Sequence, residues 1–323
     1  MKPKVYIAKK VPDEVIDYLA PICDLKMWES EETVPRSVLL REVADCEGVM
    51  LANCGVDEEF LNHAPKLKVV SNISVGYNNF ALPMMKERQV LGTNTPGVLD
   101  ETVADLVFGL ILTTARRISE LDHYVKRGEW TEKITEERFG MDVHHSTIGI
   151  IGMGRIGEAI AHRAKYGFHM KVMYHNRTPN LNLDEKLEAE YCSLETLLRE
   201  SDFVVLMTPL TEETRGIMGK EQFSLMKKSA IFINASRGET VNEGALVKAL
   251  EKREIWGAGL DVFNQEPVNP DNPLLKLANV VTLPHLGSAT VKTRADMAMH
   301  AAQNMRAILE GKEPPSLVRE LKK

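Results

Sequence analysis

The chain lacks the segments that would direct it into a membrane or out of the cell. None of its apolar runs reaches the length of about 20 residues that a membrane-spanning helix needs. The most apolar stretch, 103–112, is interrupted by Asp105 and Gly109 and followed by two arginines. The N-terminus starts like a β-strand and has no apolar core of a signal peptide. We therefore expect a cytoplasmic protein without a membrane partner.

Cysteine clusters and basic clusters are also missing. The four cysteines, at positions 23, 46, 54 and 192, form no CxxC and have no metal-ligand spacing, which favours reduced structural thiols and no metal. With a net charge of −6 and no dense stripe of lysine and arginine, the chain shows no sign of nucleic-acid binding. What remains is 44% hydrophobic and 27% charged residues over 323 positions, the balance and length of a soluble protein with two domains.

Short β-branched runs alternate with helical patterns along the chain. Such alternation predicts βαβ units and parallel sheets. The strands expected from these runs are Lys4–Ala8, Gly48–Leu51, Lys68–Asn72, Thr147–Ile151, Lys171–His175, Phe203–Thr208, Ala230–Asn234, Gly257–Asp261 and Val280–Leu283. Between the two groups of strands, apolar spacing predicts one long helix over about 101–126, which we interpret as a connector between domains.

The expected fold class is α/β, with two doubly wound parallel-sheet domains, Rossmann-like and flavodoxin-like. A last helix, about 288–309, follows the last core strand and adds no new strand. This favours a dinucleotide-binding domain, 101–289, inserted into a substrate-binding domain built from 1–100 plus 290–323. The cleft between the domains is the expected active site.

The pattern GxGxxG lies between a strand and a helix at Gly152, Gly154 and Gly157. In a dinucleotide site the first glycine permits a tight turn and the second lets the backbone approach a pyrophosphate. The third allows close packing of helix on strand, and the helix N-terminus supplies N–H donors. A plain turn between strand and helix is the alternative, but this context favours the dinucleotide.

The residues after the next strand choose between the two nicotinamide cofactors. An acid that accepts from the ribose 2′-hydroxyl is typical of NAD sites. This chain has Asn176, Arg177 and Thr178 instead, and a guanidinium suits a 2′-phosphate. We predict NADP (NADPH), with NAD as the second candidate; the alternative for Arg177 is a surface charge in a turn.

Three later strands lead into residues that suit keto-acid reduction. Arg237 could hold a carboxylate and polarise the C2 carbonyl. His285 could donate the proton, and Glu266 beside it would orient the ring and favour imidazolium. Each alone has an ordinary alternative, as a loop charge, a surface acid or a structural histidine. Their placement at successive strand ends after a dinucleotide fingerprint favours catalysis.

These segments together resemble the D-isomer-specific 2-hydroxyacid dehydrogenases, with the bacterial glyoxylate/hydroxypyruvate and 2-ketogluconate reductases as the nearest branch. The matching motifs are KLKVVSNISVGYNNF, ETVADLVFGLILTTARR, GIIGMGRIG, INASRGE, GAGLDVFNQEP and LPHLGSAT. The resemblance covers nearly the whole chain and implies an NADPH-preferring reductase of small 2-keto acids that forms a homodimer through its cofactor domains. Departures from the commoner pattern are Asn176 and the Asn-Cys-Gly at 53–55, in a loop that could touch substrate.

The resemblance also assigns roles to individual residues. It implies Arg237 as substrate clamp, Glu266 as partner of the histidine and His285 as acid/base. Backbone N–H groups of Val75 and Gly76 would hold the substrate carboxylate, and Asp261 would face the nicotinamide carboxamide. The other expected cofactor contacts are Thr102, Arg155, Ile156, Thr178, Thr208, Pro209, Ala235, Ser236 and Gly287, beside Arg237 and His285 themselves.

Two other functions stay open. Phosphoglycerate dehydrogenase would use the same residues, but the neutral stretches 51–56 and 73–76 favour substrates with uncharged tails, and the chain has no room for a regulatory domain. A dinucleotide-sensing corepressor would be expected to carry extended disordered termini, which this sequence lacks.

Overall fold

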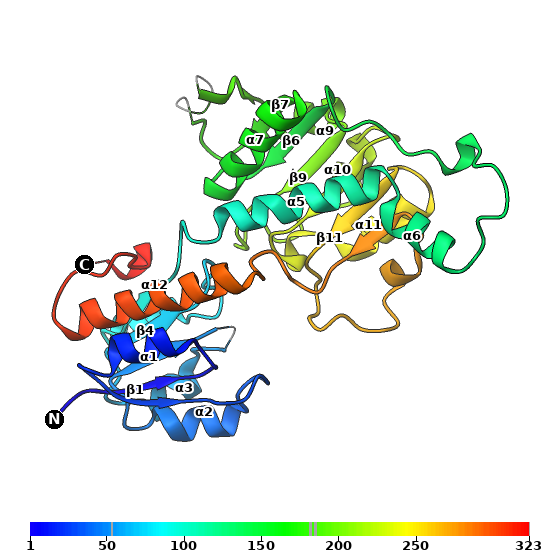
Figure 1. The fold of residues 1–323 in the computed structure, drawn as a ribbon. Helices are drawn as coiled ribbons and strands as arrows, with labels where there is room; N and C mark the ends of the chain where they lie inside the picture. The colour runs from blue at the N-terminus through cyan, green and yellow to red at the C-terminus, as the bar shows by residue number, and fades with distance from the viewer. Residues whose placement is uncertain (53, 181–182, 184–185, 323) are drawn as a thin grey trace. The chain divides into compact units, whose positions relative to one another are not determined.

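The computed structural model describes every residue except 53, 181–182, 184–185 and 323 (Figure 1). It divides into two compact units, Met1–Leu99 with Ala289–Lys323, and Asp100–Ser288. Among the helices described, none is both long enough and apolar enough to span a bilayer. Each unit is built around its own parallel sheet, and the predicted fold class is confirmed.

The sheet of the first unit has the order β2-β1-β3-β4-β5, with all neighbours parallel. This is the flavodoxin-like order of a doubly wound sheet, in which ligands bind beyond the carboxyl ends of the strands. Leu51 and Asn72 are register partners at the ends of β3 and β4, so the loops that follow them leave the same edge side by side. The strands are β1 (Lys4–Ile7), β2 (Asp24–Met27), β3 (Gly48–Leu51), β4 (Val69–Asn72) and β5 (Leu91–Thr93).

Helices cover both faces of this sheet. On one face lie α1 (Asp13–Leu19) and α12 (Val291–Leu309); on the other lie α2 (Arg36–Val43), α3 (Glu58–His63) and α4 (Leu82–Glu87). The helix α12 packs closely, because a Cβ added at Gly48 would lie 2.4 Å from the sulfur of Met305. The Ser71 hydroxyl also donates to the Ala301 carbonyl at 2.7 Å. The C-terminal segment is therefore part of this unit's core.

The sheet of the second unit has the order β12-β11-β10-β9-β6-β7-β8. With β6 taken as the first strand, the strands from β8 to β11 have the order of a Rossmann sheet, and β12 is one further strand at the edge. The order reverses between β6 and β9, and such a switch point is where dinucleotides bind. The strands are β6 (Thr147–Ile151), β7 (Lys171–His175), β8 (Glu190–Tyr191), β9 (Phe203–Leu206), β10 (Ile231–Asn234), β11 (Gly257–Leu260) and β12 (Val280–Thr282).

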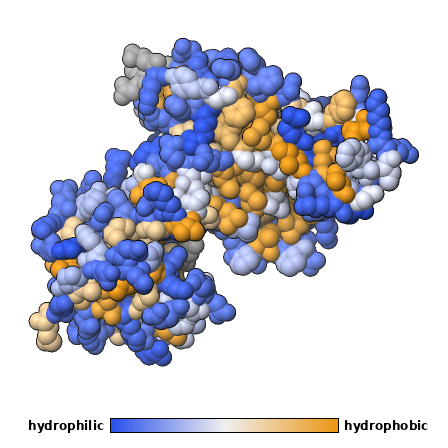
Figure 2. Space-filling view, viewed as in Figure 1, coloured by the Kyte–Doolittle hydropathy of each residue, from blue (hydrophilic) through white to orange (hydrophobic). Residues whose placement is uncertain are grey.

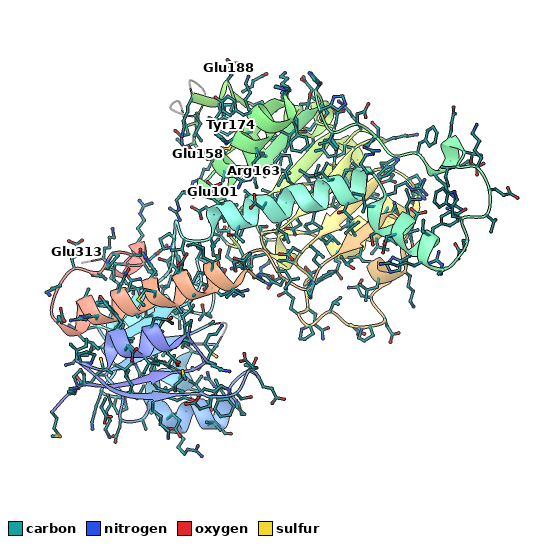
Figure 3. The ribbon with its side chains drawn as sticks, viewed as in Figure 1. Glu101, Glu158, Arg163, Tyr174, Glu188 and Glu313 are labelled. Carbon is teal, nitrogen blue, oxygen red and sulfur yellow. The ribbon has the colours of Figure 1, made fainter. Side chains whose placement is uncertain are left out.

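Helices again cover both faces. On one face α5 (Asp100–Ala115) packs against α7 (Arg155–Phe168), and on the other lie α9 (Leu194–Glu200), α10 (Lys220–Leu225) and α11 (Glu243–Glu251). Arg163 of α7 joins the first pair, with an ion pair of 2.7 Å to Glu101 of α5 (Figure 3). A second ion pair, also of 2.7 Å, joins it to Asp105 of α5. Single 3₁₀ turns occupy Glu136–Arg138, Gly238–Thr240, Pro273–Lys276 and Arg319–Leu321.

The long helix expected over 101–126 is wrong in one respect, because the structure divides it into α5 and α6 (Ile118–Lys126). The break falls at Arg117, whose φ of 56° is left-handed and incompatible with a continuing α-helix. Its guanidinium pairs with Glu120 at 2.7 Å and so stabilises the new helix start. Both helices belong to the second unit, so the segment is not a free connector.

Candidate active site

Each glycine of the GxGxxG loop is needed for a different structural reason. Gly152 has a φ of 99°, and a Cβ there would lie 2.7 Å from the backbone of Met207, which follows β9. A Cβ at Gly157 would lie 2.8 Å from the Gly152 carbonyl, so helix α7 could not pack this closely on the turn. At Gly154 a Cβ would meet nothing within 4 Å, which leaves the backbone open to a ligand. The loop has the geometry that a pyrophosphate site needs.

Polar groups without partners converge on the same loop. The first N–H groups of α7 have no intrahelical acceptor, and they form a natural anion site. Thr208, beyond β9, has a buried hydroxyl oxygen that makes no hydrogen bond within the described chain. Such a group is expected where a ligand supplies the missing partner. These residues fit a dinucleotide.

Asn176 has a structural role that the sequence did not suggest. Its Oδ1 accepts from the Met153 N–H at 2.6 Å, and its Nδ2 donates to the Met153 carbonyl at 3.1 Å. The amide therefore fastens the glycine loop to the end of β7. An aspartate could accept from the N–H but could not donate to the carbonyl. Arg177, the next residue, is exposed.

The loop after β10 presents Arg237 from a tightly bonded turn. The Arg237 carbonyl accepts from Asn234 Nδ2 at 3.0 Å and from the Thr240 hydroxyl at 2.6 Å. One guanidinium nitrogen donates to the Ser236 carbonyl at 2.7 Å, and the remaining donors have no partner among the described residues. Burial lowers the pKa of Arg237 from its ordinary value, against the opposing charges of Glu266 and Glu239. A partly buried guanidinium with unused donors is suited to bind an anion.

Gly238 brings the Arg237 loop against the loop that follows β11. A Cβ at position 238 would lie 2.0 Å from the carbonyl carbon and oxygen of Phe263, so only glycine permits this contact. Phe263 in turn donates its N–H to Glu266 Oε1 at 3.0 Å. Backbone contact thereby fixes Arg237 and Glu266 relative to one another.

His285 and Glu266 form a direct pair, with 2.6 Å between His285 Nδ1 and Glu266 Oε2. The carboxylate orients the ring and leaves Nε2 as the nitrogen that can exchange a proton. Burial raises the pKa of Glu266, but the hydrogen bond from His285, the Phe263 N–H and the neighbouring positive charges outweigh it and hold the pKa below its ordinary value. The structure thus brings the three predicted catalytic residues into one connected set.

Asp261 holds the backbone that carries His285. The His285 N–H donates to the Asp261 carbonyl at 2.9 Å, and the Asp261 carboxylate accepts from Leu286 N–H at 2.7 Å and Gly287 N–H at 2.8 Å. His285 has a φ of 55°, a left-handed conformation that costs a non-glycine residue free energy and persists only when its surroundings enforce it. Burial raises the pKa of Asp261, against the effect of these N–H donors.

A second candidate site lies in the first unit, in the loop after β4. Thr95 N–H donates to the Ser74 carbonyl at 2.9 Å, and Asn94 Nδ2 donates to the Val75 carbonyl at 2.8 Å. Because the C=O and N–H of a trans peptide point in opposite directions, these bonds turn the next two N–H groups, of Val75 and Gly76, the other way. Neither N–H has a partner in the part of the chain that the structure describes. Adjacent free N–H groups form an anion-binding nest.

The other predicted contacts are distributed around these loops. Thr102 lies on the first turn of α5, where Arg155 also pairs with Asp100 at 3.3 Å. Ala235 and Ser236 lie in the turn after β10, and Ser236 bonds to Asn234 through its N–H and its hydroxyl. Ile156 lies on the first turn of α7, Thr178 and Pro209 are exposed, and Asn53 lies outside the described residues.

Sequence reasoning missed the asparagines that hold the nest. Asn72 is fully buried at the end of β4, and Asn94 is nearly so after β5. The sequence signal that could have revealed them is an asparagine at or directly after the end of an apolar strand. A buried amide needs hydrogen-bond partners, so such a residue indicates a turn held together by hydrogen bonds.

Comparison with known proteins agrees with this geometry. Residues 108–287 match the family model "D-isomer specific 2-hydroxyacid dehydrogenase, NAD binding domain". The chain is also 48% identical to glyoxylate/hydroxypyruvate reductase B of Escherichia coli over 314 residues, 97% of this chain and 96% of that protein. It belongs to the D-isomer-specific 2-hydroxyacid dehydrogenase family.

Solved structures of similar proteins support this membership. The TT0316 protein of Thermus thermophilus superposes with a TM-score of 0.91 at 40% identity, covering 98% of this dehydrogenase and 99% of that chain. An NADPH-dependent glyoxylate/hydroxypyruvate reductase of Sinorhizobium meliloti, solved with NADP and malonate, gives a TM-score of 0.86 at 31% identity, covering 99% and 98% of the two chains. As a family member this chain is an oxidoreductase acting on CH–OH groups, with a dinucleotide-binding second unit.

Proposed function

We propose that this dehydrogenase is an NADPH-preferring reductase of small 2-keto acids, of the glyoxylate, hydroxypyruvate and 2-ketogluconate class, and that its products are D-2-hydroxy acids. The observation that carries the proposal is the 2.6 Å pair of His285 and Glu266, in one bonded set with the partly unpartnered guanidinium of Arg237. The names of its E. coli and S. meliloti relatives support the same substrates.

Each residue of the set has one task in this reaction. Arg237 binds the substrate carboxylate and polarises the C2 carbonyl, and His285 Nε2 gives its proton to the oxygen. Glu266 keeps the ring in place and stabilises its positive charge. In the first unit, the N–H groups of Val75 and Gly76 are proposed to donate to a substrate carboxylate. When bound, the reduced nicotinamide supplies the hydride to C2.

The test measures the loss of NADPH absorbance with 3-phosphohydroxypyruvate as a comparison and with glyoxylate, hydroxypyruvate and 2-ketogluconate, each at the same NADPH concentration. Turnover of at least one of them, with a D-configured product from the two larger acids, is expected. Turnover of 3-phosphohydroxypyruvate alone would make phosphoglycerate chemistry the function. Binding of NADPH without turnover of any keto acid would favour a dinucleotide-sensing protein.

The cofactor preference is expected to depend on Arg177. Arg177→Ala should weaken NADPH selectively, because a charge-assisted contact to the 2′-phosphate contributes about 1.5–3 kcal/mol. The measurement is kcat/KM for NADPH and NADH, together with the Kd of each from protein fluorescence. Arg199→Ala, on an exposed arginine of α9 that is not among the expected cofactor contacts, is the matched control. An unchanged NADPH/NADH ratio in Arg177→Ala would remove this residue from cofactor selection.

A homodimer that forms through the second unit is part of the same proposal. No residue of α6 is buried, and Ile118, Val125, Trp130 and Phe139 are at least half exposed. Figure 2 shows hydrophobic residues gathered on this face of the second unit, over α5 and α6. Exposed apolar surface of this kind is typical of a protein interface. The reductase is proposed to work in the cytoplasm, where its four cysteines, all free, stay reduced.

Placing a charge on this surface should separate the subunits. Val125→Asp would bury an unpaired carboxylate in the interface, so sedimentation should shift from twice the mass of one chain to one chain. Thr131→Asp, on an exposed polar neighbour, should leave the wild-type mass unchanged. A wild type that sediments as a single chain would remove the homodimer from the proposal.

A further inference from the structure

Two loops at the carboxyl edge of the first sheet are joined by one side chain. Asn79, in the loop after β4, donates from Nδ2 to the Cys54 carbonyl at 2.8 Å, in the loop after β3. Its Oδ1 accepts from Asn72 Nδ2 at 3.2 Å, and the same Asn72 amide holds the Gly76 carbonyl at 2.8 Å. Two hydrogen-bonded amides therefore connect Cys54 to the nest residue Gly76.

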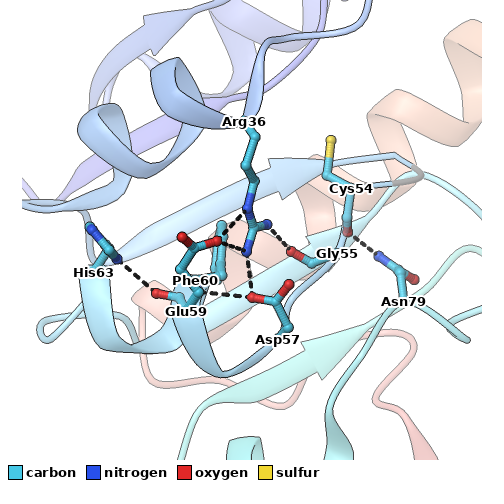
Figure 4. A network of polar contacts seen from close by, with 8 residues as sticks. All are labelled: Arg36, Cys54, Gly55, Asp57, Glu59, Phe60, His63 and Asn79. Carbon is cyan, nitrogen blue, oxygen red and sulfur yellow. Dashed lines mark hydrogen bonds and ion pairs between the residues drawn. The ribbon is translucent and has the colours of Figure 1, made fainter.

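The segment at 54–55 is fixed from its other side by Arg36 of α2 (Figure 4). The Arg36 guanidinium donates to the Gly55 carbonyl at 2.7 Å and pairs with the carboxylates of Asp57 and Glu59. Asp57 also caps α3 through the Phe60 N–H at 2.9 Å. Arg36 and its acidic partners hold the loop from outside, backbone bonds hold it at Val56, and the Asn79 side chain holds Cys54 on the side of the nest.

Adjacent parallel strands lie about 4.8 Å apart, so the loop after β3 flanks whatever the nest after β4 binds. A carboxylate held by Val75 and Gly76 fixes C1 of a keto acid there. Atoms beyond C2 then extend to a neighbouring loop. Glyoxylate has no such atoms, whereas hydroxypyruvate carries a CH₂OH group on C2.

We infer that Asn79 is a specificity-positioning residue, which sets the distance between the carboxylate nest at Val75–Gly76 and the segment Cys54–Gly55 that contacts the C3 group of the substrate. The inference rests on the proposed reduction of 2-keto acids. Asn79 touches neither the substrate nor the cofactor and acts through the two loops that it joins. Loss of the Cys54 contact should therefore affect substrates with a C3 group and spare the substrate without one.

Variants at 79 should fold, because backbone contacts of this residue remain. The Val56 N–H donates to the Asn79 carbonyl at 2.8 Å and the Ala81 N–H donates to the Val56 carbonyl at 2.9 Å, whatever the side chain. Asn79→Asp is nearly isosteric and still accepts from Asn72, but it faces the Cys54 carbonyl with an oxygen. Asn79→Ala removes both contacts. Thermal melting checks the fold of both variants.

The experiment measures kcat/KM for hydroxypyruvate and for glyoxylate at saturating NADPH. In Asn79→Ala the hydroxypyruvate/glyoxylate ratio should fall about five- to tenfold, the effect of one lost hydrogen bond, mainly through KM. Asn79→Asp should lower it at least as much. Asn94→Ala removes the hydrogen bond to the Val75 carbonyl and so loosens the nest itself. It should lower kcat/KM for both substrates by the same factor. Asn62→Asp, an exposed amide change on α3, should leave both values unchanged.

The outcomes separate the inference from the function on which it rests. If the wild type reduces both keto acids but the Asn79 variants keep its ratio, or lose both substrates equally, Asn79 does not set specificity. If the wild type reduces neither acid, the proposed function fails, and the inference fails with it. The inference also requires that the Asn79 variants keep the wild-type Kd for NADPH, because Asn79 lies in the first unit and the dinucleotide site in the second.

Discussion

Replacing His285 with alanine is expected to lower kcat for keto-acid reduction by about 10²–10⁴-fold, the usual contribution of a positioned general acid. The loss should appear in kcat rather than in cofactor binding, because proton transfer to the C2 oxygen is needed only as the alkoxide forms. Steady-state kinetics with glyoxylate, beside a fluorescence titration with NADPH, measure the two effects separately. A His285→Ala enzyme with full activity would remove the histidine from the mechanism.

Glu266→Gln is expected to be milder and to change the pH profile. In the wild type, kcat/KM should fall as pH drops through the lowered pKa of Glu266, because a protonated Glu266 loses the charge that pairs with His285; this acid limb should be absent in Glu266→Gln. Because the pKa of Glu266 lies below its ordinary value, its ionised form persists on the acid side. The contribution of the pair to stability is present above the ordinary glutamate pKa and is lost as pH falls through the lowered one. The acid limb therefore reports the protonation of Glu266.

A double variant distinguishes one proton-transfer unit from two independent residues. When two residues act as one unit, the double variant loses less activity than the product of the two single losses. The kcat of His285→Ala with Glu266→Gln should therefore be little lower than that of His285→Ala alone. Multiplicative losses, or an acid limb that persists in Glu266→Gln, would contradict the pairing.

Loss of the Arg237 guanidinium should lower activity by an amount comparable to the loss of His285. Arg237→Ala is expected to lower kcat/KM by about 10²–10³-fold, because truncating one member of a buried charged contact costs several kcal/mol. Arg237→Lys keeps the charge but loses the two-pronged geometry that matches a carboxylate. Its kcat/KM should therefore lie between those of Arg237→Ala and the wild type, with a higher KM and a lower kcat than the wild type.

NADPH binding is the control for both Arg237 variants. Its Kd should change little if the guanidinium holds the substrate carboxylate and carbonyl. Near-wild-type kcat/KM in Arg237→Lys, with weakened NADPH binding, would instead assign the residue to the cofactor.

Most of the sheets could be predicted because their strands are continuous apolar runs. Thr147–Ile151 and Lys171–His175 were expected and found with the same bounds as β6 and β7. The strands β2 and β5 were missed for physical reasons, as was β8, which has only 2 residues. In β2 no residue is buried, as suits an edge strand, and β5 has only 3 residues. Neither leaves a pattern that differs from a loop.

Parts of the candidate site depend on contacts between distant segments and leave no local pattern. The approach of Gly238 to Phe263 and the bond from Asn79 to Cys54 join residues that are neighbours only in the folded chain. The break at Arg117 was hidden because arginine is a good helix former, and its left-handed backbone is set by the surrounding fold. The strand-end residues were easier to predict, since parallel sheets place ligands at one edge.

The division of the first unit between the two ends of the sequence determines the order in which the protein can fold during synthesis. The second unit is one continuous stretch and can fold as soon as it has left the ribosome. The first unit cannot complete its core at that stage. Gly48 packs against Met305, and the carbonyl of Gly92 accepts the N–H of Val318, so β3 and β5 wait for partners made after the whole second unit. Until then α1 alone covers one face of the β1–β5 sheet, and the apolar surface that α12 will bury there stays exposed to aggregation.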